Sequence, residues 1–550
     1  MKKKPNEVTV LSMKKLGAVL LCLCLLLPFC ACGKKLPKTA NKDFTYQISE
    51  EPKTLDPQVA SDSGALIAIE ALYEGLARLD AKGEAYPGVA EKWVSNSSRT
   101  EFTFTLRQDA KWADKNGTPV TAQDFVYAFR RALDPATGSK TCAPLFAIKN
   151  AEKIHSGQLG TASLGVSAKD DHTLVVELEY ADPDFPALTA LAVFMPCNET
   201  FFKSTDGRYG LDYKYLLGNG PFEIDGKYGW EHDVSISMAR SDTYTGNSTP
   251  LPSSLKLTIE GTDNKITDPV SALTSKKVDA IGLTSSQADD AEAAGCTLTS
   301  FQNITWGLCF NTQSGLMKNQ KVRTAFVQAL NRSALLKLLP KGTTAASSVI
   351  CPSVSLDGNK YLSLIGNRTF FLKQSSSAAS LLSAGLAELP GQDLKNVSVL
   401  CPDNSSVKLV INQMIADWNS KFNSYFSMEP LDDDTLAQRI KTGNYQMAVC
   451  PIQPDSGDPY GTLSLFRSGE TSNPARFSSA DFDTTLAAAR MKTGSSALSG
   501  YMDAETILSS QAVFYPLYYD KTYYASAEGV TGIIFHPFSD AIDFIQAGKD

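Results

Sequence analysis

The sequence contains a single long apolar segment, which runs from Leu16 to Cys32 near the N-terminus. Its uninterrupted apolar stretch is shorter than the ~20 residues of a membrane-spanning helix, and it contains Pro28. Two basic residues, Lys14 and Lys15, precede it. A basic stretch, an apolar stretch and a small residue before a cleavage point are typical of an export signal. Because no second apolar segment of this kind follows, we expect the rest of the chain to fold as a soluble protein outside the cytoplasm.

The end of this segment, Phe29-Cys30-Ala31-Cys32-Gly33, resembles a bacterial lipobox, in which a cysteine after a small residue is lipidated and becomes the first residue. Cys32 fits this role because Ala31 precedes it. Cys30 stays open as an alternative, since Phe29 stands where leucine is usual, and so does a plain signal peptide with incidental cysteines. A lipidated cysteine carries two acyl chains, which anchor a protein stably, whereas a single chain anchors it marginally.

These features predict a lipoprotein signal peptide at residues 1–31 and a lipidated cysteine with a polar tether at residues 32–43. The mature protein is then expected at the outer face of the cytoplasmic membrane. The seven cysteines after Cys32 are widely spaced, and no CxxC pair occurs among them. We therefore interpret them as scattered, buried apolar side chains.

The composition is that of an ordinary globular protein, with 43% hydrophobic and 20% charged residues. At about 150 residues per domain, the 550 residues suggest three or so domains. The net charge of -7 argues against a general nucleic-acid binder, because such proteins usually present a basic surface.

The sequence offers no signature of a catalytic or metal-binding protein. No GxSxG, HExxH or CxxC motif occurs. The four histidines are isolated and lack metal-ligand spacing: His155, His172, His232 and His536. We therefore expect no enzymatic activity, no metal site and no cofactor.

Helical and strand periodicities alternate along the chain. In residues 65–79 apolar side chains recur on one helical face, whereas residues 100–107 alternate as a strand does. Thr121 followed by Asp124 approximates a capping box. This predicts a helix that starts after Thr121 and stops before Pro135.

A further helix is predicted over residues 321–338, before Pro340. Residues 396–401, 406–419 and 445–450 are typical of a strand, a helix and a strand. Such alternation indicates an α/β lobe with a partly parallel sheet. Ligands of these sheets bind beyond the carboxyl ends of the strands, so we expect a ligand at the loop after residues 445–450.

Several motifs, taken in order, resemble those of one protein family. The stretch 101–135, EFTFTLRQDAKWADKNGTPVTAQDFVYAFRRALDP, resembles the signature region of the extracytoplasmic oligopeptide- and dipeptide-binding proteins of ABC importers, solute-binding protein family 5. Matching motifs follow one another along nearly the whole mature chain: Glu51-Pro52-Lys53-Thr54-Leu55-Asp56-Pro57, Tyr86-Pro87-Gly88-Val89-Ala90, Gly218-Asn219-Gly220-Pro221-Phe222, Lys321-Val322-Arg323-Thr324-Ala325 and Pro516-Leu517-Tyr518-Tyr519. On these motifs the chain is identified as a member of that family.

The resemblance implies an α/β fold of the periplasmic-binding-protein type, also called a Venus flytrap, in which two lobes joined by a hinge close over a ligand. It also implies an extra domain on the first lobe. The first lobe is then discontinuous and comprises residues 44–72, 200–300 and 520–550. The extra domain covers residues 73–199, and the second lobe covers residues 301–519.

The function that the resemblance implies is peptide capture in the cleft between the lobes, followed by delivery to an ABC permease whose ATPases drive transport. The expected partners are peptides, the permease subunits and, through the lipid anchor, the membrane. No nucleic acid is expected, and the protein is expected to be a monomer. Relatives of this fold bind nickel chelates, haem or oligosaccharides, and a peptide-sensing receptor is a further alternative.

The resemblance also implies which residue binds the N-terminus of the ligand. In similar peptide binders an Asp in the loop after this strand holds the α-ammonium of the ligand, and Asp455 falls on that position within the loop 453–459. Peptides share this charged group, and a carboxylate in a water-poor cleft binds it with about 1.5–3 kcal/mol. A turn-capping role suits the same residues. We expect Asp455 to contact the ligand, and we interpret Asp458, a second candidate, as more structural.

The peptide backbone is expected to pair like an added strand. By resemblance its partners are the backbones near Ser61 and Ser63 on one side and near Pro451 and Gln453 on the other. Pro451 has no N–H, so its carbonyl alone can serve. Tyr519 either lines the cleft or belongs to the core.

The sequence departs from the family pattern at three positions. Ile452 stands where an aromatic residue is common, and Thr141 and Val449 stand where some oligopeptide binders have Tyr and Arg. These differences leave open how the ligand's carboxylate is held. Arg439 and Lys441 are candidates, with a solvated helix face as the alternative.

Overall fold

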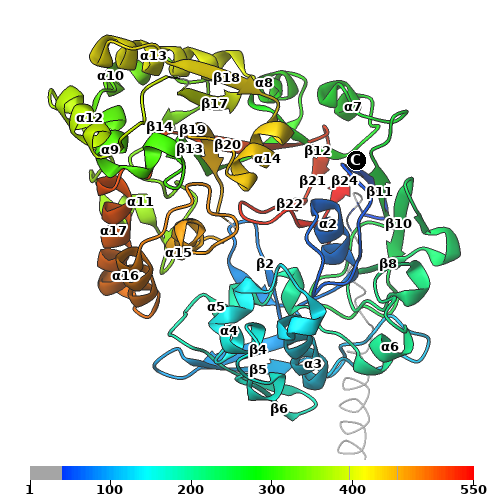
Figure 1. Ribbon diagram of the computed structural model, residues 1–550. Coiled ribbons are helices and arrows are strands. Elements are labelled where there is room, and N and C mark those ends of the chain that lie inside the picture. Colours follow the sequence, from blue (N-terminus) through cyan, green and yellow to red (C-terminus); the bar gives the residue numbers. More distant parts are fainter. Residues whose placement is uncertain (1–36, 38–39, 396, 455) are drawn as a thin grey trace, which may run out of the picture.

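The structure of the protein is a computed structural model that describes residues 37, 40–395, 397–454 and 456–550. The expected signal peptide and the candidate lipidation sites lie outside these residues. Within the described ranges, no helix is both long and apolar enough to span a membrane. The chain forms two lobes, and a smaller domain with its own sheet lies at the lower end of the molecule (Figure 1).

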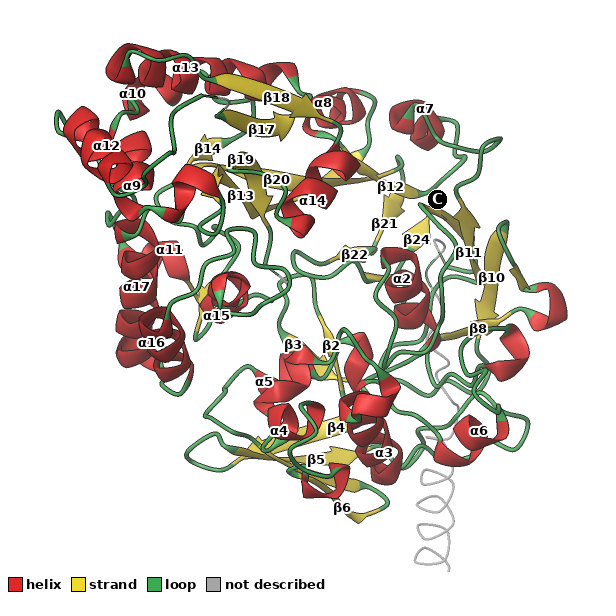
Figure 2. Cartoon of the chain, in the orientation of Figure 1, coloured by secondary structure: helices red, strands yellow, loops and turns green. Residues whose placement is uncertain are grey.

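A twelve-stranded mixed sheet runs through both lobes (Figure 2). Its longest strands, β13 (Thr297–Phe310) and β20 (Phe514–Ser526), pair antiparallel along most of their length. At one end β20 pairs with β12 (Ala280–Leu283), and at the other end β13 pairs with β19 (Met447–Ile452). The chain therefore leaves the first lobe along β13 and returns to it along β20. The other strands of this sheet are β1 (Asp43–Ile48), β8 (Phe222–Ile224), β9 (Trp230–Glu231), β10 (Ser235–Arg240), β11 (Ser254–Ile259), β14 (Thr344–Ala345), β17 (Ser398–Pro402) and β18 (Ser427–Leu431).

The pairing of β13 with β20 shifts register between Trp306 and Gly307 and, nearer the first lobe, between Phe301 and Ile304. The buried side chain of Asn303 satisfies backbone and hydroxyl groups at the shift nearer the first lobe. Its amide donates to the carbonyl of Pro537 at 2.6 Å, and its oxygen accepts from the hydroxyl of Thr522 at 3.0 Å. Apolar side chains of β13 before the shift pack on the first-lobe core, and those after it pack on the second-lobe cores. The shift therefore marks the point where β13 passes from one lobe to the other.

Separate sets of buried apolar side chains confirm the predicted two-lobed α/β architecture. The first-lobe core joins β1, β11 and α2 (Ser63–Leu72) to the C-terminal segment 525–547. In the second lobe a core lies on each face of the sheet: Val449 packs in one, and its neighbour Cys450 packs in the other. A strand that is buried on both faces occupies the middle of a covered sheet.

The smaller domain is built on a four-stranded antiparallel sheet that packs on the first-lobe core. Its strand order is β4 (Ala90–Ser95), β5 (Glu101–Leu106), β7 (Thr173–Glu177) and β6 (Val166–Asp170). The strand predicted over residues 100–107 is confirmed as β5. The helix predicted after Thr121 is confirmed as α3 (Ala122–Leu133), and a carboxylate oxygen of Asp124 accepts from the N–H of Thr121 at 2.7 Å. We call this unit the extra domain.

The predicted strand–helix–strand alternation of the second lobe is also confirmed. The strand β17 is followed by α13 (Ser405–Phe422), β18, α14 (Asp433–Thr442) and β19. Because β17 pairs in parallel with both β18 and β19, this part of the sheet is parallel. The remaining helices that bear on the site are α4 (Ala151–His155), α5 (Phe185–Leu188), α15 (Pro459–Leu463), α16 (Ala480–Arg490) and α17 (Gly494–Ser510).

The helix predicted over residues 321–338 is wrong in its length. The helix α9 (Gln320–Gln328) ends early, and α10 (Arg332–Leu335) begins after Asn331. The side-chain oxygen of Asn331 accepts from the N–H of Ala334 and caps the new helix, which interrupts the periodic pattern.

The helix predicted over residues 65–79 also ends early, at Leu72 of α2. Gly75 then passes so close to the carbonyl of Thr189 that a Cβ atom would lie 2.3 Å from that oxygen. The chain continues as the strand β2 (Ala77–Leu79). The predicted last turns of the helix are therefore replaced by an extended segment that packs against a distant part of the chain.

Candidate functional site

The strand β19 lies between β17 and β13 in the second-lobe sheet, and its carboxyl end is paired with β13 alone. Pro451 pairs with Trp306 of β13, and its side chain is exposed. Ile452 is buried in the lobe core, and Gln453 is exposed again. Two of the predicted ligand residues, Pro451 and Gln453, therefore share the accessible side of this strand end.

The loop after β19 contacts the first lobe. Asp455, the residue expected to hold the ligand ammonium, lies outside the described residues. Two residues later, the carbonyl of Gly457 accepts from the N–H of Ser355 at 2.8 Å. A Cβ atom on Gly457 would lie 3.2 Å from the ring of Phe538, which belongs to the C-terminal segment of the first lobe. The loop is thus placed at the interface between the lobes.

Asp458 is the N-cap of α15. One of its carboxylate oxygens accepts from the N–H of Gly461 at 3.0 Å, and the other accepts from the hydroxyl of Ser456 at 3.1 Å. Asp-Pro at a helix start favours this geometry, because an Asp side chain satisfies a free N–H and Pro fits the first turn. Both oxygens of this candidate therefore have partners within the second lobe.

A cavity of about 170 Å³ lies between the second lobe and the extra domain. The extra domain contributes residues 180–184 with α5, and the second lobe contributes residues 355–357, the loop around Asp458 and the end of α16. Burial, together with the neighbouring carboxylate of Asp458, raises the pKa of Asp182 to about 7. The cavity shows that the two sides approach closely enough to remove charged groups from water.

Ser61 and Ser63 stand at the start of α2 in the first lobe, where Ser61 is exposed and Ser63 is half-buried. Asp62 between them caps the helix, since one of its oxygens accepts from the N–H of Ala65 at 2.8 Å. Its other oxygen is buried and has no partner among the described residues. Asp62 is not among the residues predicted from the sequence, although Ser-Asp-Ser before an apolar helix is the signal of such a cap.

The side chain of Tyr519 belongs to a core of the second lobe, which favours the second of the two alternatives that the sequence left open for it. It is 3% exposed. Its hydroxyl oxygen accepts from the N–H groups of Ser347 and Ser348 at 3.2 and 3.1 Å. A hydroxyl that is buried with these partners fixes the loop 346–351 and offers no free group to a ligand.

Arg439, a candidate for the ligand's carboxylate, has partners in its own lobe. It donates to Glu429 at 2.9 Å and to the carbonyl of Asn444 at 2.7 Å. Lys441 on the same helix is exposed. This geometry favours the alternative, a solvated helix face.

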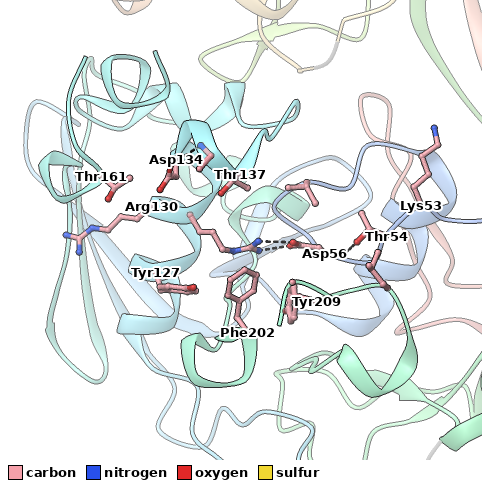
Figure 3. A pocket seen from close by; sticks show the side chains of 15 residues that line it. Lys53, Thr54, Asp56, Tyr127, Arg130, Asp134, Thr137, Thr161, Phe202 and Tyr209 are labelled. Atoms are coloured by element: carbon pink, nitrogen blue, oxygen red, sulfur yellow. Dashed lines mark hydrogen bonds and ion pairs between the residues drawn. The ribbon is translucent and has the colours of Figure 1, made fainter. Parts of the chain in front are cut away.

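A second cavity, of about 780 Å³, lies between α3 and the segments around residues 54 and 209 (Figure 3). At its centre the guanidinium of Arg131 binds both carboxylate oxygens of Asp56, at 2.6 and 2.8 Å. The same guanidinium donates to Gln58 and lies 4.5 Å from the ring centre of Phe202. Arg131 thus joins the extra domain to the first lobe.

The described residues include no cluster of three or more His, Cys, Asp or Glu side chains that fits a metal ion. The seven cysteines in this part of the chain are buried and unpaired. Burial raises the pKa of Cys351 and of Cys401 to about 11, which keeps these thiols protonated.

Comparisons with known proteins place the chain in a family. The model of the bacterial extracellular solute-binding proteins, family 5 (Middle), matches residues 84–474. The dipeptide-binding protein DppE of Bacillus subtilis (strain 168) is 26% identical over 517 residues, which are 93% of each chain. The periplasmic murein peptide-binding protein MppA of Escherichia coli (strain K12) is 29% identical over 482 residues, which cover 87% of this chain and 88% of the relative.

Solved structures agree with this result. The substrate-binding domain of an oligopeptide ABC transporter from Bacillus anthracis str. Ames superposes with a TM-score of 0.73 at 26% identity, over 94% of this chain and 100% of the other. The sequence motifs, the two-lobed fold and the family match agree. The chain therefore belongs to family 5 of the bacterial extracellular solute-binding proteins.

Proposed function

We propose that this chain is the substrate-binding component of an ABC transporter, which captures peptides between its lobes and delivers them to a membrane permease. The observation that carries the proposal is the position of the loop after β19, where Gly457 of the second lobe lies so close to Phe538 of the C-terminal segment that a Cβ atom would be 3.2 Å from its ring. A ligand bound at this loop contacts both lobes and so favours the closed form by its differential affinity. The relatives are named for binding dipeptides and murein peptides, and this favours peptides as the ligand class.

In this proposal Asp455 binds the α-ammonium of the peptide. The backbones near Pro451 and Gln453 pair with the peptide on the side of the second lobe. The backbones near Ser61 and Ser63 do so on the side of the first lobe. Support comes from the exposed strand end at Pro451 and Gln453 and from the exposed position of Ser61.

The proposal further treats residues 73–199 as the extra domain and residues 301–519 as the second lobe. The chain acts as a monomer and neither binds ATP nor catalyses a reaction, since the permease and its ATPases supply transport.

Cys32 carries the lipid that holds the protein at the outer face of the cytoplasmic membrane. Cys32→Ser is then expected to release the protein into the soluble fraction, whereas retention in the membrane pellet would indicate Cys30 or an uncleaved anchor.

Mass spectrometry of the ligands that co-purify with the mature protein tests the ligand class. Peptides are the expected result. A nickel chelate, haem or an oligosaccharide in their place would overturn the peptide assignment while leaving the family unchanged.

Titration calorimetry with tri-L-alanine tests the recognition chemistry. Asp455→Ala is expected to weaken binding tenfold or more, which corresponds to about 1.4 kcal/mol. N-acetylation of the peptide is expected to weaken its binding to the unmodified protein by a similar factor. Unchanged affinity in both experiments would remove ammonium binding by Asp455 from the proposal.

A further inference from the structure

The extra domain contacts the second lobe directly, although the chain connects the two by way of the first lobe. The loop Tyr180–Asp184 and α5 line one side of the 170 Å³ cavity, and α15 with the end of α16 lines the other. In Figure 1 α15 and α16 stand above the cyan elements α4 and α5. Closure of the lobes therefore involves the extra domain as well as the first lobe.

Arg490, the last residue of α16, lines this cavity. Its guanidinium carbon is 3.9 Å from the ring centre of Tyr460 and 4.5 Å from the ring centre of Tyr180. Tyr460 packs on a second-lobe core, whereas Tyr180 packs on the core shared by the first lobe and the extra domain. One cation is thus held between two rings that belong to opposite sides of the interface.

A second arginine supports this arrangement. Arg467 donates to the hydroxyl of Tyr460 at 3.1 Å, which orients the ring on which Arg490 stacks. The guanidinium of Arg467 also lies 3.8 Å from the carboxylate of Glu152 on α4 of the extra domain. This ion pair is partly exposed and therefore contributes little.

The charged side chains around the cavity also favour a cation at this position. Four carboxylates and two cations line it: Asp182, Asp184, Asp357, Asp458, Arg490 and Lys492. Asp182 belongs to the extra domain and Asp458 to the second lobe, so closure brings like charges together. Burial and Asp458 raise the pKa of Asp182, and the charge of Arg490 counteracts this shift. Arg490 thus offsets a repulsion that opposes closure.

We propose that Arg490, stacked between Tyr180 and Tyr460, is an interlobe latch that stabilises the closed form without touching the ligand. The inference rests on the proposed function, because it assumes a protein that closes over its cargo. The stacking on Tyr180 forms when the lobes meet, so it contributes to closure around every ligand alike. Loss of the latch therefore lowers the affinity for different ligands by one common factor, whereas loss of a ligand contact changes the preference among them.

Two variants remove the latch from opposite sides. Arg490→Met keeps the length of the side chain and removes its charge, and Tyr180→Leu removes the ring that the charge faces. Tyr180→Phe keeps the ring and serves as the conservative variant. Arg208→Met is the matched control, because Arg208 stacks on Tyr215 at 4.3 Å within the first lobe.

Two measurements separate the latch from the ligand. Spin labels at Val94→Cys in the extra domain and Leu409→Cys in the second lobe, both exposed positions, report the distance between these parts by pulsed electron paramagnetic resonance. Calorimetric titration with tri-L-alanine and penta-L-alanine reports affinity. We expect Arg490→Met and Tyr180→Leu to lengthen the distance in the ligand-free protein and to weaken both peptides about tenfold, or about 1.4 kcal/mol, as expected for a desolvated cation–π contact.

Tyr180→Phe and Arg208→Met are expected to leave the distance and both affinities unchanged. An unchanged distance in Arg490→Met and Tyr180→Leu would overturn the latch. A changed ratio between the two peptides would also overturn it, because Arg490 would then contact the ligand. If the unmodified protein binds neither peptide, the proposed ligand class fails, and the distance in the ligand-free variants still decides whether the latch exists.

Discussion

The ion pair between Asp56 and Arg131 is expected to stabilise the junction of the first lobe with the extra domain. The two side chains are 8% and 9% exposed, and two hydrogen bonds of 2.6 and 2.8 Å join them. Each bond involves charged groups on both sides and contributes about 1.5–3 kcal/mol. Arg131→Met removes both bonds and leaves the carboxylate of Asp56 buried, for which a loss of about 3–5 kcal/mol is expected.

The free energy of unfolding in urea, followed by circular dichroism, measures this loss. Asp56→Asn, which leaves the guanidinium without its countercharge, is expected to destabilise the protein in the same direction. The double variant Asp56→Asn/Arg131→Met is expected to lose less than the sum of the two single losses, because neither charge is then left alone. The double-mutant cycle should give a coupling of about 2 kcal/mol or more, as for contacting buried charges.

The matched control is an exposed ion pair in the extra domain. Lys149 and Glu177 lie 2.7 Å apart, and their side chains are 52% and 49% exposed. Lys149→Met is expected to leave the stability unchanged, because solvent screens such a pair. Additive losses in the buried pair, or a loss no larger than that of the control, would refute the reasoning.

Three further predictions concern stability. Asp458→Ala is expected to lower the free energy of unfolding by about 1 kcal/mol, because the cap of α15 is lost. Asp458→Asn is expected to keep both the cap and the stability. Equal losses of the two variants in urea titrations would contradict a capping role. Burial raises the pKa of Glu505 to about 7 despite hydrogen bonds from Ser348 and Tyr361. The stability that its protonated form contributes is therefore present at pH 4.5 and is lost as the pH rises through 7. Glu505→Gln should flatten the dependence of the thermal midpoint on pH in this range, and an unchanged slope would contradict this assignment to Glu505. Gly220→Ala places a Cβ atom 2.4 Å from the backbone nitrogen of Tyr73 and should lower the free energy of unfolding in urea by about 1–3 kcal/mol. Gly160→Ala, with open space around it, should lower this free energy much less. Similar losses in the two variants would show that crowding is not the cause.

The elements that the sequence predicts well depend on residues close together in the chain. The capping box of Thr121 and Asp124 and the alternation of β5 are local signals, and both are confirmed. The cap formed by Asp458 follows from the Asp-Pro pair in the same way. Helix ends were predicted less well, because the end of α2 depends on the distant carbonyl that Gly75 approaches.

The parts of the site that the sequence does not predict arise from contacts over long sequence distances. Residues 514–519 of β20 are all buried, so alternation gives no sign of which face Tyr519 occupies. The stacking of Arg490 on Tyr180 joins the second lobe to the extra domain, and neither residue stands in a motif. Resemblance to a family points to the ligand loop, whereas the contacts that surround this loop require the three-dimensional arrangement.

The register shift at Asn303 has a consequence for how the lobes move. The chain crosses between them along β13 and β20, and these strands are hydrogen-bonded to each other on both sides of the shift. Opening is therefore expected to flex a two-stranded ribbon while its backbone hydrogen bonds persist. Flexure of this kind is expected at the two irregular steps of the pairing, and at the first of them Asn303 also holds Pro537 of the C-terminal segment. The same amide therefore ties the flexing part of the ribbon to the C-terminal segment of the first lobe.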